Sequence, residues 1–167
     1  YEKNKDSYED IFKSIKFVKL NLQNLTGSDD YDSLFFKKID EIDDLIVDGK
    51  NLNFIIKKFN LGNSNLLNFN RLGKSKGAKK IDNFPNKLIQ NVFNISETEP
   101  TILIENDEEY FIIELIKTEK IQKKVNDDSV KKDILAKLKK EIKRKLITEI
   151  ISRINKNNFN KIDFDKL

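Results

Sequence analysis

The chain has 167 residues and contains no His, Cys, Met or Trp. Without imidazole and thiol groups, the sequence excludes His general bases, thiolate nucleophiles, Ser-His-Asp triads and zinc sites of the usual nitrogen and sulfur type. The 32 basic and 28 acidic residues nearly cancel to a net charge of +4. Residues 130–156 contain ten of the basic and three of the acidic residues, so the positive charge is concentrated in that segment.

The first third of the chain predicts a strand followed by two helices. Residues 2–14 are polar and helix-compatible, and we interpret them as the end of a helix. Residues 15–22 alternate apolar and polar side chains, which predicts a strand. Apolar residues at three- and four-residue spacing predict helices over about 30–48 and 52–59.

The middle of the chain predicts a short strand, a helix and a β-hairpin. Residues 66–69 favour a strand, and Pro85 opens a helix with an apolar side. Two β-prone runs at 101–104 and 110–116 predict a hairpin with a five-residue connection. Together with the preceding strand and helices, these elements indicate an α+β fold.

Two segments are similar to ion-binding motifs, a phosphate-binding loop and a calcium loop, but neither segment matches its motif. Gly73 and Gly77 are too closely spaced for a phosphate-binding loop, and Ala78 stands where that motif needs Lys. We therefore expect residues 71–80 to form a mobile, solvated loop. The acidic run at 105–109 lacks the length and central Gly of a calcium loop, so we expect a charged hairpin tip. The sequence predicts no cofactor and no metal.

The last element is a long basic helix. Apolar residues recur every four positions from Val130 to Ile154, which predicts one amphipathic helix of about 27 residues. Three interpretations remain open: a surface packed on its own chain, a surface for a partner or membrane, and a nucleic-acid contact. We favour packing of the helix on its own chain, because an apolar stripe along a helix is usually buried against another part of the protein. Few aromatic residues lie among these charges, which disfavours nucleic acid.

The order of elements over residues 14–118 resembles a parvulin-type peptidyl-prolyl isomerase domain. The most specific segment begins with Leu88-Ile-Gln-Asn-Val-Phe93, continues through Pro100 to Ile104, and is followed by Tyr110-Phe-Ile-Ile-Glu-Leu-Ile116. The resemblance implies a small antiparallel sheet with surrounding helices. Residues 1–13 and 119–167 are similar to the helical chaperone regions that flank parvulin domains in SurA- and PpiD-type proteins of the bacterial cell envelope.

The resemblance also implies a site whose polar residues are replaced. The family's first-strand His falls on Lys19, its Cys or Asp approximately on Gly62, and its last-strand His on Phe111. The apolar side of the site is retained. Phe69, in the run that begins at Leu66, and the pair Phe84 and Leu88 match family residues that enclose a substrate proline.

These matches predict a folding factor that binds unfolded or newly translocated polypeptides and has weak or no isomerase activity. The alternatives are an active prolyl isomerase with an atypical site, in which Lys19 replaces a donor, and a basic helix that binds anionic lipid or nucleic acid. The resemblance implies the periplasm, an inner-membrane anchor outside this chain, proximity to the translocon and pairing of two copies through the terminal helices. No run of 18 apolar residues is present, and the absence of Met leads us to expect a fragment.

Overall fold

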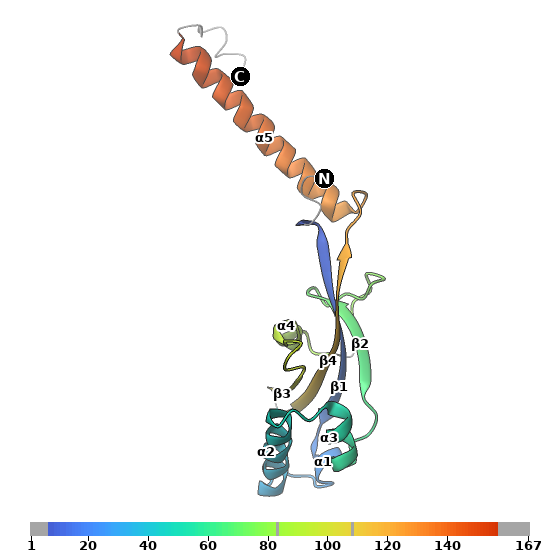
Figure 1. The fold of residues 1–167 in the computed structure, drawn as a ribbon. Helices are drawn as coiled ribbons and strands as arrows, with labels where there is room; N and C mark the ends of the chain where they lie inside the picture. Colours follow the sequence, from blue (N-terminus) through green and yellow to red (C-terminus); the bar gives the residue numbers. More distant parts are fainter. Residues whose placement is uncertain (1–6, 83, 108, 157–167) are drawn as a thin grey trace. The chain divides into compact units, whose positions relative to one another are not determined.

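The structure is a computed structural model that describes residues 7–82, 84–107 and 109–156 (Figure 1). The chain divides into two compact units. The larger unit is Asp10–Ile121, and the smaller unit combines Tyr1–Glu9 with Gln122–Leu167. The part of the chain that the structure describes forms a four-stranded antiparallel sheet and five helices, so the predicted α+β class is confirmed.

The larger unit contains the sheet and four helices. Its strand order is β2-β1-β4-β3, which places β1 and β4 at the centre. Phe12–Phe17 pair with Asn65–Asn70, and Thr101–Asn106 pair with Glu109–Glu114, both antiparallel. The elements in chain order are β1 (Glu9–Leu20), α1 (Leu22–Leu25), α2 (Ser33–Val47), α3 (Leu52–Phe59), β2 (Asn65–Asn70), α4 (Asn86–Asn94), β3 (Thr101–Asn106) and β4 (Glu109–Gln122).

Short polar residues set the ends of α2 and α3. The Asp32 side chain accepts a hydrogen bond from the Phe35 amide at 2.8 Å, and Asn51 does the same for the Phe54 amide at 2.9 Å. Each bond satisfies an amide that has no partner inside its helix. Helix α3 ends at Asn60, whose φ of 53° turns the chain into the left-handed conformation.

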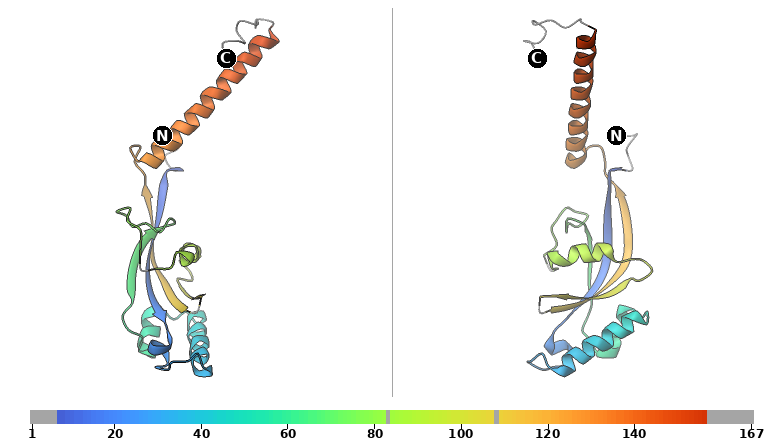
Figure 2. Two further views of the ribbon diagram at one scale, coloured as in Figure 1. Left: turned by 180° about the vertical axis from the view of Figure 1, so that it is seen from behind. Right: turned by 90° about the vertical axis from the view of Figure 1, so that its left-hand side faces the viewer.

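The sheet buries a separate hydrophobic core on each face, because successive strand side chains point to opposite sides. In β1, Ile15 and Phe17 pack with the apolar side of α4, whereas Val18 and Leu20 pack with α1, α2 and α3. Figure 2 shows α4 at a different place on the sheet from the other three helices. The two cores hold the strands in one register, since a slip of one residue would exchange the faces.

The prediction of a helix over residues 2–14 is wrong from Glu9 onward, where β1 begins; residues 1–6 lie outside the described part of the chain. Polar residues in this segment obscured the alternation of apolar and polar side chains that predicts a strand. Lys13 is 6% exposed, and its ammonium group lies on backbone carbonyls of the α4 end. Pairing with β2 and burial of Phe12 therefore outweigh the helix-compatible composition.

Two predicted loops also differ from the structure. Residues 71–80 are mostly exposed, as expected of a solvated loop, but part of the segment is a hairpin, because Lys74 and Lys80 form an antiparallel bridge and the Ile81 amide donates to the Gly73 carbonyl at 3.0 Å. In the β3–β4 hairpin, Asn106 pairs with Glu109, so the connection is shorter than the predicted five residues. In both segments, polar residues that the sequence assigns to a loop take part in backbone pairing.

The smaller unit contains α5 (Asp128–Asn155), which confirms the predicted long helix. Its first turns are held to the N-terminal residues. The Tyr8 hydroxyl donates to Asp133 at 2.8 Å, the Tyr8 carbonyl accepts from the Lys123 amide at 2.7 Å, and Val130 is 1% exposed. No helix in the described ranges is long and apolar enough to cross a membrane.

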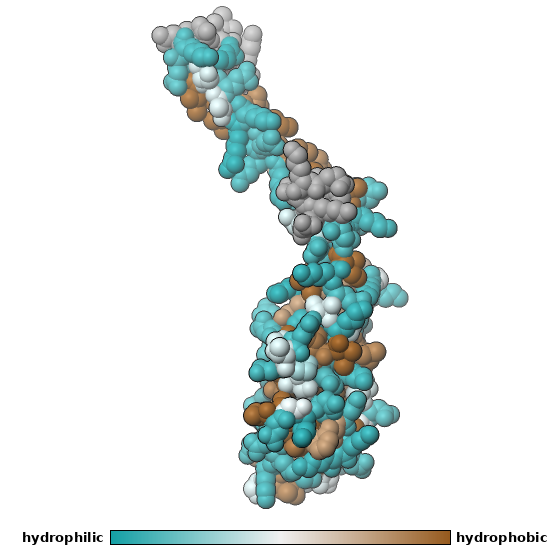
Figure 3. All heavy atoms as spheres, viewed as in Figure 1, coloured by the Kyte–Doolittle hydropathy of each residue, from teal (hydrophilic) through white to brown (hydrophobic). Residues whose placement is uncertain are grey.

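The apolar positions of α5 do not form the single stripe expected of an amphipathic helix. At 3.6 residues per turn, each four-residue step advances about 40° around the axis, so six steps from Val130 to Ile154 turn about 240°. Seven apolar side chains beyond the first turn are about half exposed, and Figure 3 shows brown patches along the helix. They are Leu135, Leu138, Ile142, Leu146, Ile147, Ile151 and Ile154.

Candidate functional site

A groove of about 720 Å³ lies on the face of the sheet that α4 covers. Strands β1, β2 and β4 form its base and one side, and the segment that leads into α4 forms the other side. Strand periodicity explains this arrangement, because Phe17 and Lys19, Asn65 and Leu67, and Glu109 and Phe111 are pairs two residues apart. The remaining lining residues are Leu66, Asp82, Phe84, Pro85 and Asn86.

Three phenylalanine rings make the floor of the groove. Phe17 and Phe84 meet edge to face with ring centroids 5.0 Å apart, and Phe111 lies 6.4 Å from both. Each of the three residues is at most 5% exposed. Edge-to-face packing and burial fix these rings, so the floor is a preformed apolar surface.

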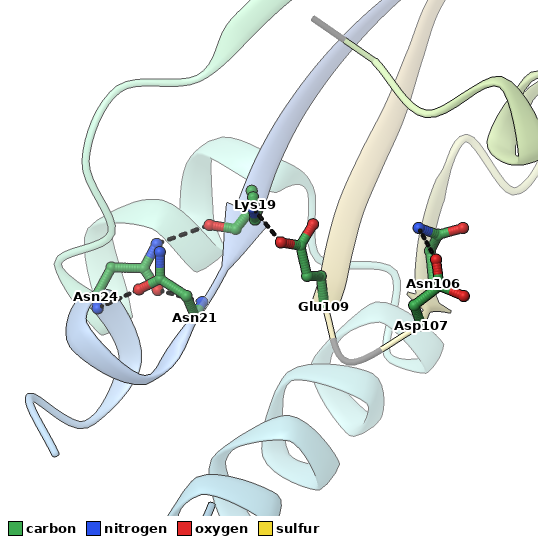
Figure 4. Close-up of polar contacts among 6 residues, drawn as sticks. All are labelled: Lys19, Asn21, Asn24, Asn106, Asp107 and Glu109. Carbon is green, nitrogen blue, oxygen red and sulfur yellow. Dashed lines mark hydrogen bonds and ion pairs between the residues drawn. The ribbon is translucent and has the colours of Figure 1, made fainter. Parts of the chain in front are cut away.

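An ion pair between Lys19 and Glu109 joins the two central strands at the groove. Figure 4 shows the two side chains pointing toward one another from β1 and β4. Each side chain is a little over 40% exposed. Asn24 donates to the Lys19 carbonyl at 2.7 Å, while Asn21 and Asn24 cap each other, so the end of β1 is braced next to the pair. The groove therefore offers a cation and a carboxylate beside an apolar floor.

The structure brings four of the seven predicted site residues together. Lys19, Leu66, Phe84 and Phe111 all line the groove, although they come from distant parts of the sequence. Leu66 is the most accessible of them, with 67% of its surface exposed at the outer strand β2. Phe111, which the resemblance matches to the family's last His, belongs to the floor as a buried aromatic ring.

The other three predicted residues lie outside the groove lining. Phe69 is fully buried beneath the floor, where its ring stands 5.6 Å from Phe84. Leu88 is 2% exposed and packs in the core below α4. Gly62 is exposed in the link between α3 and β2, with open space where a side chain would project. Phe69 and Leu88 therefore support the groove from below.

Sequence reasoning missed several lining residues. Phe17 shares a strand face with Lys19, so the two-residue period of β1 was a signal that could have found it. The sequence indicates Glu109 only as part of a charged hairpin tip. Asp82 and Asn86 flank the start of α4 and have no pattern that marks them in the sequence.

Lys13 fixes the end of α4 behind the groove. Its ammonium group donates to the carbonyls of Val92, Phe93 and Ile95 at 3.2, 3.2 and 2.7 Å. These carbonyls belong to the helix end, where backbone acceptors lack partners and the helix dipole favours a cation. Burial lowers the pKa of Lys13, the charge of Arg71 lowers it further, and Glu97 opposes both.

The groove chemistry suits non-covalent binding. Among the described residues that line it there is no Ser, Thr or Tyr hydroxyl, and the sequence contains no His or Cys, so the side chains that remain are apolar, amide, Lys and carboxylate groups. Within the described ranges, no group of three or more acidic residues is arranged to hold a metal ion. The available interactions are apolar contact, amide hydrogen bonds and the charges of Lys19, Glu109 and Asp82.

Comparisons with family models, curated proteins and solved structures found no match to this chain. The parvulin resemblance therefore rests on the sequence segments quoted above and on the order of elements in the larger unit.

Proposed function

We propose that this chain is a folding factor that binds unfolded or newly translocated polypeptides in the groove between β1, β2, β4 and the start of α4. The observation that supports this proposal most directly is the convergence of Lys19, Leu66, Phe84 and Phe111 on one preformed groove. A preformed aromatic floor suits the apolar side chains that unfolded chains expose.

Weak or absent prolyl isomerase activity is part of this proposal. Rotation about a prolyl amide has a barrier of about 18–20 kcal/mol, and catalysis requires groups that bind the twisted amide better than the planar one. Each factor of ten in rate needs about 1.4 kcal/mol of such selectivity. Phe111 and Gly62 supply no polar side chain, and Lys19 is engaged by Glu109.

The alternative is an active isomerase in which Lys19 acts as a replacement donor. It is favoured by one observation, the presence of the Lys19 side chain in the groove lining. Release of Lys19 from Glu109 would then be required before it could bond a substrate carbonyl.

Placement in the cell envelope is a further part of the proposal and is supported only by the resemblance to SurA- and PpiD-type chaperones. The exposed apolar side chains of α5 support a second contact surface, for clients or for another copy of the chain. The net charge of +7 between residues 130 and 156 would also attract anionic lipid or nucleic acid, which steep weakening by salt would reveal.

Two assays on the intact chain test the proposal. We expect the protein to suppress aggregation of an unfolded client, and we expect a proline-containing tetrapeptide to isomerise at no more than about twice its uncatalysed rate. Leu66→Ser should weaken the suppression, because Leu66 is an exposed apolar residue of the outer strand at the border of the groove. Val47→Ser is the matched control, since Val47 is 81% exposed on α2 and does not line the groove.

Substantial rate enhancement that Lys19→Met abolishes would support the active isomerase instead. Equal loss of client protection in the Leu66 and Val47 variants would contradict a role for the groove.

A further inference from the structure

Strand β2 leaves one row of backbone groups facing away from the sheet. It is the outer strand next to β1, and its residue Asn70 points its backbone outward. The Asn70 amide donates to the Lys74 carbonyl, and the Asn70 carbonyl accepts from the Gly73 amide, both at 2.9 Å. Because outward and inward residues alternate along an antiparallel strand, the backbones of Asn68 and Leu66 also face outward.

The outward amides and carbonyls of Leu66 and Asn68 have no backbone partner within the described part of the chain. An outer strand with such groups is a template for another strand, and proteins commonly block it with charges, proline or a covering helix. Strand β2 has neither charge nor proline in its sequence, Asn-Leu-Leu-Asn-Phe-Asn. The opposite edge is different, because α2 packs against β3 and Thr101 is only 7% exposed.

The free edge of β2 borders the groove. Asn65 and Leu67 alternate with the outward-facing residues and line the groove together with Leu66. A strand added along this edge would place every second side chain on the groove side, above Leu67 and next to Phe84. Main-chain bonds would then hold the added strand, and the apolar floor would receive its side chains.

The charges of the lining favour one kind of segment. Its ionisable groups are Lys19, Glu109 and Asp82, and the first two neutralise each other in an ion pair. Asp82 remains as an exposed carboxylate at the start of the groove wall. A basic residue in the bound segment would complement this charge, whereas an acidic residue would be repelled.

We propose that β2 binds its client by strand addition: an extended polypeptide segment, alternately apolar and flanked by Lys or Arg, pairs with the backbone of Leu66 and Asn68 and inserts apolar side chains into the groove. This inference rests on the proposed polypeptide-binding function and specifies how the same groove would hold a chain. Main-chain pairing requires no particular client sequence, which suits a protein that meets many unfolded chains.

A set of labelled peptides tests the pairing. The parent peptide alternates apolar and polar residues between flanking lysines, and fluorescence anisotropy measures its binding to the intact protein. Two analogues are N-methylated on one or the other alternate set of amides. We expect one set to weaken binding at least tenfold and the other to change it less than twofold, because only one set faces β2. A peptide with flanking Glu should bind several-fold more weakly than the parent.

Two variants test the same pairing from the protein side. Leu66→Pro removes an amide that faces away from β1, so the β1–β2 ladder is retained, and Leu66→Ala removes only the side chain. We expect the proline variant to bind the parent peptide at least tenfold more weakly than the alanine variant, with thermal unfolding showing that both are folded.

The possible failures are distinguishable. Equal binding of the parent and both N-methylated peptides would overturn strand addition while leaving client binding in the groove intact. Absence of peptide binding to the unmodified protein would overturn both proposals. A dimer that Leu66→Pro dissociates, without any peptide binding, would assign the edge to a second copy and would also contradict the proposal.

Discussion

At the scale of single residues, Lys13 shows how a charged side chain supports the groove without lining it. The lysine is nearly buried, yet it has three carbonyl partners at the end of α4. Hydrogen bonds to a charged donor typically contribute about 1.5–3 kcal/mol, and leaving buried acceptors without partners is costly. Lys13 therefore stabilises the C-terminal end of the helix that forms the groove wall.

Replacing this lysine should destabilise the larger unit. We expect Lys13→Met to lower the free energy of unfolding by about 2 kcal/mol, measured by urea denaturation, since Met retains the apolar stem but cannot donate. Lys37→Met is the control, because Lys37 is an exposed residue of α2. Equal stability of the two variants would show that the hydrogen bonds from Lys13 to the α4 carbonyls make no net contribution to the free energy of unfolding.

Single residues also show what the sequence could and could not predict about the site. The resemblance identified Lys19 and Phe111, and the β1–β4 pairing places both at the groove. The resemblance matches Phe69 and Leu88 to apolar positions of the parvulin family, but a match of residue types cannot distinguish a residue that lines a groove from one buried behind it. Glu109 contributes to the site only because β4 lies beside β1, a long-range pairing that local patterns do not contain.

At the scale of elements, the apolar periodicity predicted α2, α3, α4 and α5 close to their observed bounds, and the β-prone runs predicted the β3–β4 hairpin, although β4 continues to Gln122, well beyond the predicted end at residue 116. The errors concern β1 and the loops, where backbone pairing with another segment decides the conformation. The early part of β1 is polar at several positions and becomes a strand because β2 pairs with it. Such pairing joins residues about fifty positions apart and leaves no local pattern in the sequence.

The hairpin at 71–80 is packed closely against α4 through Gly73. This glycine has a φ of +67°, and an added Cβ would approach the Ile89 Cδ1 atom to 2.7 Å. We therefore expect Gly73→Ala to destabilise the unit by about 1–2 kcal/mol in thermal or urea unfolding, through backbone strain and crowding.

Gly77→Ala provides a matched control within the same hairpin. An added Cβ there would meet only the Ser75 hydroxyl at 3.9 Å, which is an ordinary contact. A Gly73 variant as stable as the Gly77 variant would contradict the packing of this hairpin on α4.

The same hairpin is joined to β4 by charge. Lys76 and Lys117 donate to Glu119 and hold the pKa of its carboxyl at about 2, below the ordinary 4.5. A lowered carboxyl pKa stabilises the fold above pH 4.5, and this contribution is lost as the pH falls toward 2. We expect an NMR titration to give a pKa near 2 for Glu119 and a higher value in Lys76→Met.

Lys79→Met is the control for this titration, since neither contact of Glu119 involves Lys79. A Glu119 pKa near 4.5 in the unmodified protein would contradict the two ion pairs.

At the scale of the whole molecule, the absence of His and Cys limits the chemistry, and the fold determines which interactions remain. The larger unit supplies a preformed groove with a free strand edge, and the smaller unit supplies a basic helix with exposed apolar side chains. Both features suit the non-covalent binding that we propose. The four-residue repeat predicted α5, but the winding of its apolar positions follows from the 3.6-residue turn and argues against a single flat partner.

The central claim is that unfolded polypeptides bind in the groove. Amide chemical-shift mapping of the isotopically labelled chain, titrated with an unfolded client, tests it most directly. The account predicts the largest shift changes at Leu66, Leu67, Phe84 and Phe111, with Leu66→Ser weakening the interaction. Changes confined to residues 130–154, or no changes at saturating client, would contradict it.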